Sequence, residues 1–169
     1  MECIMKYYIA DSAVFIMGYT KNINYSSLIT VPSVTDELKS DESVMRFELA
    51  RENGIRVEMP DSESKNKVLE MAQYTRDLDE LSSTDIDILA KALEYKNSEF
   101  GNITLLTDDY AVQNVAELLK INVEPIAQKK IKDRLVWEKE CIGCKKRFDK
   151  GDTCPICGSA LKKKRKRKV

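Results

Sequence analysis

A short apolar run that stops at two adjacent carboxylates constrains the fold of this chain more than any other stretch. Residues 103–119 begin as a buried strand, reach Asp108 and Asp109, and continue in a helical pattern with Ala111 and Val115 on one face. In open α/β sheets ligands gather outside the carboxyl ends of the strands, so this carboxylate pair lies where chemistry is usual. The competing interpretation is that Asp108 only caps the helix, because aspartate is a preferred N-cap.

A second apolar run ends in the same way. Residues 4–10 read as a buried strand, and Asp11 follows directly with Ser12 beside it. A carboxylate is therefore expected at the tip of another strand. Capping is again the alternative, here for a helix through Ala13 to Tyr19.

Two more acidic residues fall on the inner faces of expected helix starts. Glu37 lies three residues after Val34, a spacing that puts both side chains on one helix face. Asp85 shares a face with Ile88 and Leu89. An inward-facing carboxylate is costly unless something positive meets it, so both residues are candidates for a functional site.

The acidic residues beside these two are expected to be structural. Ser33 and Asp36 have the spacing of a capping box, which would engage Asp36 with helix-end backbone. Asp87 is expected on an outer helix face, in a surface ion pair with Lys91 four residues on.

Convergence of the candidate carboxylates would demand a cation. Like charges held together raise each other's pKa values or destabilise the fold unless divalent ions neutralise them. Hard oxygen ligands suit Mg²⁺ or Mn²⁺, which can hold a phosphate oxygen and activate a water for attack on a phosphodiester. The chain contains no histidine, which excludes Ser-His-Asp and Cys-His catalysis, a histidine acid/base ribonuclease mechanism and any zinc site with histidine ligands.

Four motifs together resemble the acidic motifs of PIN-domain nucleases. They read D-S-A-x-F-I, T-V-P-S-V-x-x-E, L-S-x-T-D-x-x-I-L-A and L-L-T-D-D-Y-A-x-Q-N-V-A, in this order across nearly all of residues 1–128. The last motif is similar to that of archaeal Nob-type ribosome-assembly endonucleases rather than to the short PIN toxins. The resemblance implies metal ligands at Asp11, Glu37, Asp85 and one of Asp108 or Asp109, and it leaves that last choice open.

Two complete C-x-x-C pairs follow near the end of the chain. Cys141 with Cys144, and Cys154 with Cys157, supply the four thiolates that close the tetrahedral shell of a structural zinc. Disulfides or a redox pair are the alternative, but they are disfavoured in the reducing cytoplasm where we expect this protein. A PIN-like domain followed by a four-cysteine zinc ribbon is also the domain order of the Nob-type nucleases.

Charge is divided sharply along the chain. Residues 1–128 carry 12 Lys or Arg and 23 Asp or Glu, a net charge of −11, whereas residues 129–169 carry 16 and 5, a net charge of +11. The basic end suits a polyanion such as RNA, with a solubilising tail as the alternative. The candidate RNA-binding residues form one unbroken run: Lys162, Lys163, Lys164, Arg165, Lys166, Arg167 and Lys168.

These patterns predict a three-layer α/β domain with a mainly parallel sheet, followed by a small zinc ribbon. The expected boundaries are a nuclease domain over 1–128, a basic connector over 129–140, the ribbon over 141–158 and a disordered tail over 159–169. No apolar run is long enough to span a membrane.

The resemblance implies a metal-dependent endoribonuclease that matures the 3′ end of precursor small-subunit rRNA within the assembling small ribosomal subunit. The alternatives are a toxin-like PIN ribonuclease that acts on other RNA, and a catalytically silent RNA-binding assembly factor.

Overall fold

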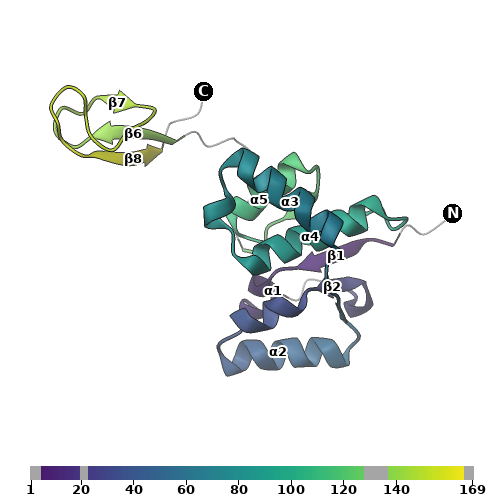
Figure 1. Cartoon of the computed structure of the whole chain (residues 1–169). Coiled ribbons are helices and arrows are strands. Elements are labelled where there is room, and N and C mark those ends of the chain that lie inside the picture. The colour runs from purple at the N-terminus through teal and green to yellow at the C-terminus, as the bar shows by residue number, and fades with distance from the viewer. Residues whose placement is uncertain (1–4, 20–22, 128–136, 166–169) are drawn as a thin grey trace. The chain divides into compact units, whose positions relative to one another are not determined.

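The chain folds into two compact units, Met1–Lys129 and Lys130–Val169. The structure is a computed structural model that describes residues 5–19, 23–127 and 137–165 (Figure 1). Each unit has its own sheet and is considered by itself.

The first unit is built on a five-stranded sheet in the order β3-β2-β1-β4-β5. Every pairing in this sheet is parallel, which confirms the sheet expected from the sequence. The strands are β1 (Tyr7–Ala10), β2 (Leu28–Thr30), β3 (Arg56–Val57), β4 (Ile103–Leu106) and β5 (Asn122–Glu124).

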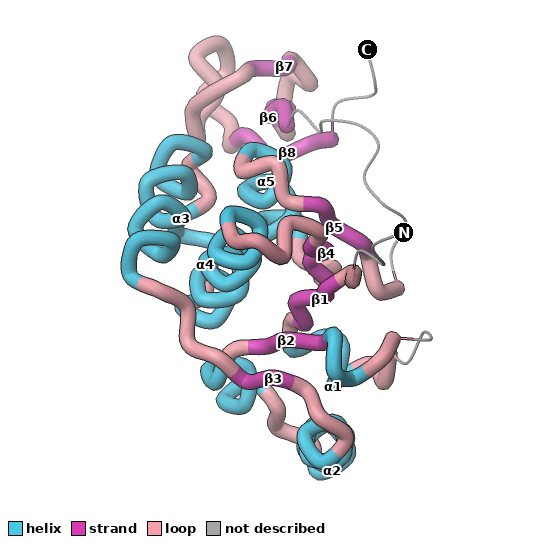
Figure 2. Tube along the Cα trace, turned by 90° about the vertical axis from the view of Figure 1, so that its right-hand side faces the viewer, coloured by secondary structure: helices cyan, strands magenta, loops and turns pink. Residues whose placement is uncertain are grey.

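Helices cover both faces of this sheet and produce the expected three layers. α3, α4 and α5 lie on one face, whereas α1 lies on the other with α2 packed beside it (Figure 2). The α-helices are α1 (Ser12–Ile16), α2 (Asp41–Glu52), α3 (Ser62–Thr75), α4 (Ser83–Asn97) and α5 (Tyr110–Leu118). Three 3₁₀ helices complete the unit: η1 (Tyr25–Ser27), η2 (Pro32–Glu37) and η3 (Leu78–Glu80). No helix in the described ranges is long and apolar enough to cross a membrane.

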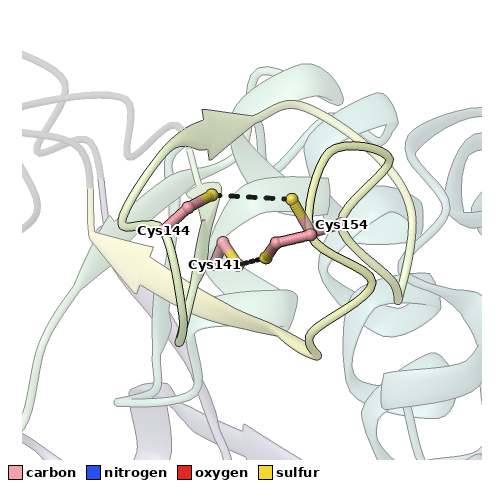
Figure 3. Close-up of side chains that lie close together, drawn as sticks. Cys141, Cys144 and Cys154 are labelled. Carbon is pink, nitrogen blue, oxygen red and sulfur yellow. Dashed lines mark hydrogen bonds between the residues drawn. The ribbon is translucent and has the colours of Figure 1, made fainter.

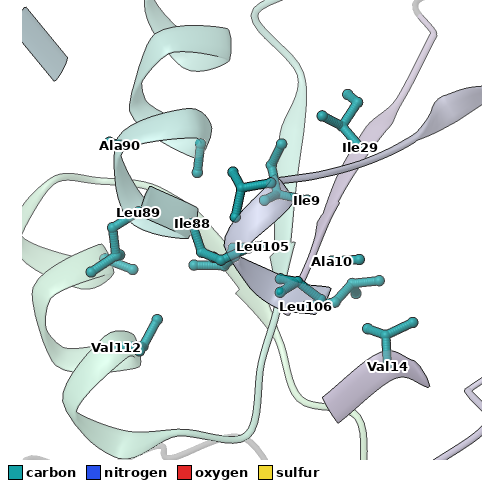
Figure 4. Packing of buried hydrophobic residues seen from close by; sticks show 14 of the residues in the cluster. Ile9, Ala10, Val14, Ile29, Ile88, Leu89, Ala90, Leu105, Leu106 and Val112 are labelled. Atoms are coloured by element: carbon teal, nitrogen blue, oxygen red, sulfur yellow. The ribbon is translucent and has the colours of Figure 1, made fainter. Parts of the chain in front are cut away.

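The core lies where α4 and α5 pack against the two central strands. Ile9 of β1 and Leu105 of β4 are fully buried, and Ile88 of α4 and Val112 of α5 meet them from the helical layer (Figure 4). Because both faces of the central strands are covered, these strands read in the sequence as continuous apolar runs. This packing fixes the carboxyl ends of β1 and β4 side by side.

The second unit is a three-stranded antiparallel sheet in the order β7-β6-β8. Its strands are β6 (Trp137–Cys141), β7 (Arg147–Phe148) and β8 (Leu161–Arg165). Two boundaries expected from the sequence are therefore wrong, because β6 begins inside the expected connector and β8 occupies the first part of the expected disordered tail. Backbone pairing with β6 and cross-strand ion pairs hold β8 in place, as between Lys164 Nζ and Glu140 Oε2 at 2.7 Å. Lys166, Arg167 and Lys168 lie outside the described residues.

Candidate active site and zinc centre

The strand order of the first unit reverses between β1 and β4, and the candidate active site lies at this reversal. Ala10 is paired with Leu106 at the ends of these strands, so Asp11 and Thr107 leave the sheet as neighbours. The Thr107 hydroxyl donates a hydrogen bond to Asp11 Oδ2 at 2.8 Å and accepts one from the backbone N–H of Asp109 at 3.1 Å. Open parallel sheets bind ligands at such a switch point.

Asp11 is the most deeply buried carboxylate at this end of the sheet. Only 6% of its surface is exposed, and its Oδ1 accepts the Ser12 backbone N–H at 2.7 Å as the N-cap of α1. Burial raises the pKa of Asp11 from 3.8 to about 6 against the opposing effect of these hydrogen bonds, and the charges of Asp85 and Glu37 raise it further. Asp11 therefore caps a helix and also faces other carboxylates.

Glu37 and Asp85 are linked through one serine. Glu37 lies half-buried at the end of η2, where Ser82 Oγ donates to its Oε1 at 3.4 Å. Ser82 is also the N-cap of α4, and Asp85 Oδ2 accepts the Ser82 N–H at 2.8 Å in a reciprocal capping box. Burial raises the pKa of Asp85, and the charges of Asp109 and Glu37 add to the effect. Both carboxylates thus face the group around Asp11.

The two adjacent carboxylates after β4 have different surroundings. Asp109 is the N-cap of α5 and accepts the backbone N–H groups of Ala111 at 2.8 Å and Val112 at 3.1 Å. Asp108 accepts the backbone N–H of Ile126 at 2.7 Å and so holds the segment after β5. The alternative interpretation, that Asp108 only caps the helix, is therefore wrong, because Asp109 is the cap. Asp109 is the member of the pair whose charge acts on Asp85.

The expected surface position of Asp87 and its expected ion pair with Lys91 are also wrong. Asp87 is buried, not on a surface face, and its partners are Ser33 Oγ at 3.0 Å and Lys65 Nζ at 2.7 Å. Lys91 is itself buried and pairs with other carboxylates, with Glu94 Oε1 at 2.9 Å and Glu58 Oε2 at 3.2 Å. The reason is that α4 is covered on several sides, by the sheet, α3 and η2, whereas the expectation assumed one buried stripe.

The predicted capping box at the start of η2 does not form. η2 begins after Val31 with Pro32 as its first residue, and no side chain in the described part of the chain caps it. Ser33 instead points its hydroxyl to Asp87, and Asp36 is exposed.

The carboxylate group offers oxygen ligands to a hard cation. Among the described residues, the four cysteines alone bring three or more ligand atoms within 4.8 Å of one another. Asp11, Glu37, Asp85 and Asp109 act on one another through their charges without forming such a compact group. Mg²⁺ and Mn²⁺ keep several waters and use few direct carboxylates, so this oxygen-only donor set suits them.

The four cysteines of the second unit form a compact tetrathiol cluster (Figure 3). Cys141 Sγ lies 3.3 Å from Cys157 Sγ, and Cys144 Sγ lies 3.7 Å from Cys154 Sγ. Sulfur atoms on a tetrahedral zinc with Zn–S bonds of about 2.3 Å are roughly 3.8 Å apart. The cluster therefore has the size that a zinc ion requires.

The surroundings of the second knuckle favour thiolates, and both knuckles share a tight backbone turn. The Ser159 hydroxyl and backbone lower the pKa of Cys157 to about 6, which favours the ionised ligand. The residue after each second cysteine, Lys145 or Gly158, has a left-handed φ of 62° or 74°. A Cβ at Gly143 would come within 2.7 Å of Ser159 Oγ, so a larger residue here would displace the Ser159 side chain.

Sequence comparisons agree with the architecture. The family model of a PIN domain of ribonuclease matches residues 8–95. A protein named Endoribonuclease Nob1 from Archaeoglobus fulgidus is 37% identical over 94% of this chain and 90% of its own length. Another of that name, from Methanocaldococcus jannaschii, is 38% identical over 95% of this chain and 79% of its own length. A protein named Ribonuclease VapC1 from Thermoplasma acidophilum is 35% identical over 92% of this chain and 77% of its own length.

The parallel sheet with acids at its switch point and the matching family model define a PIN-domain nuclease with endoribonuclease activity. Within that class, the chain belongs to the Nob1 endoribonuclease family, because the similarity extends through the tetrathiol unit.

The sequence indicates the acids as candidates but not the residues that support them. Thr107 joins Asp11 to Asp109, and Ser82 joins Glu37 to Asp85. The capping-box spacing of Ser82 and Asp85 was a usable signal for the second connection. The first depends on the register between two strands far apart in the sequence.

Proposed function

We propose that this endoribonuclease hydrolyses RNA with Mg²⁺ or Mn²⁺ held by Asp11, Glu37, Asp85 and Asp109. The observation that carries the proposal is the buried Asp11 at the switch point, with its pKa raised to about 6 while two other carboxylates face it. Such a group is unfavourable unless a cation binds, and perturbed carboxylates cluster at functional sites.

Hydrogen bonds orient the proposed ligands. Thr107 and the Ser12 N–H contact both oxygens of Asp11, while Ser82 contacts both Glu37 and Asp85. A divalent ion held by these residues would lower the pKa of a bound water and neutralise charge on the phosphate. The resemblance to PIN nucleases implies products with a 3′-hydroxyl and a 5′-phosphate. Asp108 is given a different role, in anchoring the segment after β5.

The proposed substrate is the single-stranded 3′ extension of precursor small-subunit rRNA, cut to its mature end within the assembling subunit in the cytoplasm. This assignment rests on the resemblance to the Nob-type ribosome-assembly endonucleases and on the relatives that carry the Nob1 name. A carboxylate site with metals contacts backbone phosphate rather than base edges, and flexible single strands reach such a site more easily than a duplex. Selection of the cut must then come from other contacts.

The tetrathiol unit is proposed to hold a structural zinc and to supply contacts to the RNA. Lys162 and Lys163 are exposed on β8, and neither forms an ion pair within the described residues. Lys164 is exposed but pairs with Glu140, which reduces its availability for phosphate. Contacts made beside the cut raise the local concentration of the correct phosphate over the active site.

The test is to map cleavage by the purified protein with Mn²⁺ on a precursor fragment that spans the mature 3′ end. A scrambled sequence and a duplexed version of the same site serve as comparisons, and Asp11→Asn is the inactive control. Cutting at the mature boundary of the single strand supports the proposal. Equal cutting of the scrambled RNA would favour the second candidate, a toxin-like ribonuclease acting on other RNA. The similarity to Ribonuclease VapC1 is the observation that supports this candidate.

A further inference from the structure

Asp87 is a buried carboxylate that the proposed metal site does not use, and it pairs with the partly exposed Lys65. Asp87 is 7% exposed although it lies only two residues from Asp85. Its Oδ1 is buried and meets Lys65 Nζ at 2.7 Å, and its Oδ2 accepts the Ser33 hydroxyl at 3.0 Å. Since one oxygen faces an ammonium group and the other a hydroxyl, Asp87 is already neutralised and is not arranged as a ligand.

Asp87 connects the two segments that carry Glu37 and Asp85. Ser33 lies in the first turn of η2, the short helix that ends at Glu37, whereas Asp87 lies in the first turns of α4 beside Asp85. A second contact reinforces the first, because the Thr84 hydroxyl donates to the Ser33 carbonyl oxygen at 3.3 Å. Ser33 is thus held to α4 through its side chain and its backbone.

The connection matters because, apart from the packing of the fully buried Val34 in the core, few polar contacts hold η2. Within the described residues no side chain caps this helix, and Glu37 itself is held by a single 3.4 Å contact with Ser82. Six residues of 3₁₀ helix have weak intrinsic stability. The position of Glu37 relative to Asp85 therefore depends on how firmly Ser33 is held to α4.

We propose that Asp87 is a positioning residue that sets the separation of Glu37 and Asp85 through Ser33. Lys65 neutralises the negative charge of Asp87, so that Asp87 does not act as a further metal ligand. The inference rests on the proposed metal-dependent function. Residues that orient metal ligands affect metal affinity or activity by about 10-fold to 100-fold when they are replaced. Loss of the Ser33 hydroxyl should act on metal binding more than on folding.

The test compares Ser33→Ala with Thr35→Ala in the full chain. Both changes remove one hydroxyl from η2, but Thr35 Oγ1 donates only to the Pro32 carbonyl oxygen, at 2.7 Å within the same helix. We expect Ser33→Ala to weaken Mn²⁺ binding about tenfold by titration calorimetry, whereas Thr35→Ala binds like the parent. Saturating Mn²⁺ should restore most of the cleavage rate of Ser33→Ala.

Thermal unfolding in chelator separates positioning from general damage. If Ser33→Ala unfolds near the parent temperature yet binds Mn²⁺ weakly, the positioning role is supported. Equal Mn²⁺ affinities for the parent and both variants would overturn the inference while leaving the proposed function intact. A parent protein that binds no Mn²⁺, or an Asp11→Asn variant that binds it equally well, would overturn the proposed function and the inference with it.

Discussion

Replacement of Asp11 by asparagine should stabilise the metal-free protein at neutral pH even though it destroys the proposed active site. Below pH 3.8 the carboxyl group is protonated in both the folded and the unfolded chain. Between pH 3.8 and about 6 the folded protein keeps a proton that the unfolded chain has lost. Stability therefore falls as the pH rises through this window and stays lower above it.

The size of the effect follows from the same pKa values. A rise from 3.8 to about 6 means that ionised Asp11 costs the fold up to about 3 kcal/mol, because one pKa unit corresponds to about 1.4 kcal/mol. Asparagine keeps an oxygen for the Ser12 N–H and presents an amide to Thr107, whose hydroxyl can accept as well as donate. Asp11→Asn should thus remove the charge and retain the hydrogen-bonding frame.

The assay is urea unfolding in chelator at pH 5, pH 7 and pH 8. The parent should lose stability between pH 5 and pH 7, and Asp11→Asn should lose less. An Asp36→Asn variant, which changes an exposed carboxylate, is the control and should follow the parent. Saturating Mn²⁺ should reverse the order, because a ligand at 100 times its Kd adds about 2.7 kcal/mol to a protein that binds it. An Asp11→Asn protein less stable than the parent in chelator at pH 7 would refute the reasoning.

Three further predictions address the rest of the molecule. Asp109→Asn should abolish Mn²⁺ binding, as measured by calorimetry. Asp108→Asn should retain Mn²⁺ binding and lower the temperature of thermal unfolding, because Asp108 holds the backbone of Ile126 rather than facing the other carboxylates. Cys141→Ser should release zinc and unfold the second unit while the first stays folded, as followed by elemental analysis and NMR, since small zinc modules fold with their metal. Lys162→Gln combined with Lys163→Gln should reduce the salt dependence of RNA binding by about 1.4 in the log–log slope, and an unchanged slope would remove these lysines from the interface.

The sheet and its helices were predictable because apolar periodicity reports burial on two faces. The expected strand over 103–106 and the helix after it are present at β4 and α5. β8 could not be predicted in this way, because its sequence is almost entirely basic. β8 is stabilised by backbone pairing with β6 and by ion pairs with acidic residues of β6. Neither interaction produces an apolar pattern in the sequence.

The candidate acidic residues could be selected from the sequence, but their individual surroundings could not be predicted. A single-stripe helix pattern placed Asp87 at the surface, whereas α4 is enclosed by three neighbours and Asp87 is buried against Ser33 and Lys65. The difference between Asp108 and Asp109 depends on the backbone of Ile126, 18 residues further along the chain. Local sequence carries no signal for such a contact.

The sequence presents capping and metal binding as alternatives, but in this fold the residues that cap helices are also the proposed metal ligands. Asp11, Asp85 and Asp109 each accept backbone N–H groups at the start of a helix, namely α1, α4 and α5. The N-terminal end of a helix carries a partial positive charge, which stabilises a carboxylate by about 0.3 to 1 kcal/mol at an exposed position. Three such ends meeting at one switch point offset part of the repulsion among the acids, and they do so before any ion binds. The site can therefore fold in the absence of metal and still keep enough negative potential, in Asp11 above all, to attract a divalent cation.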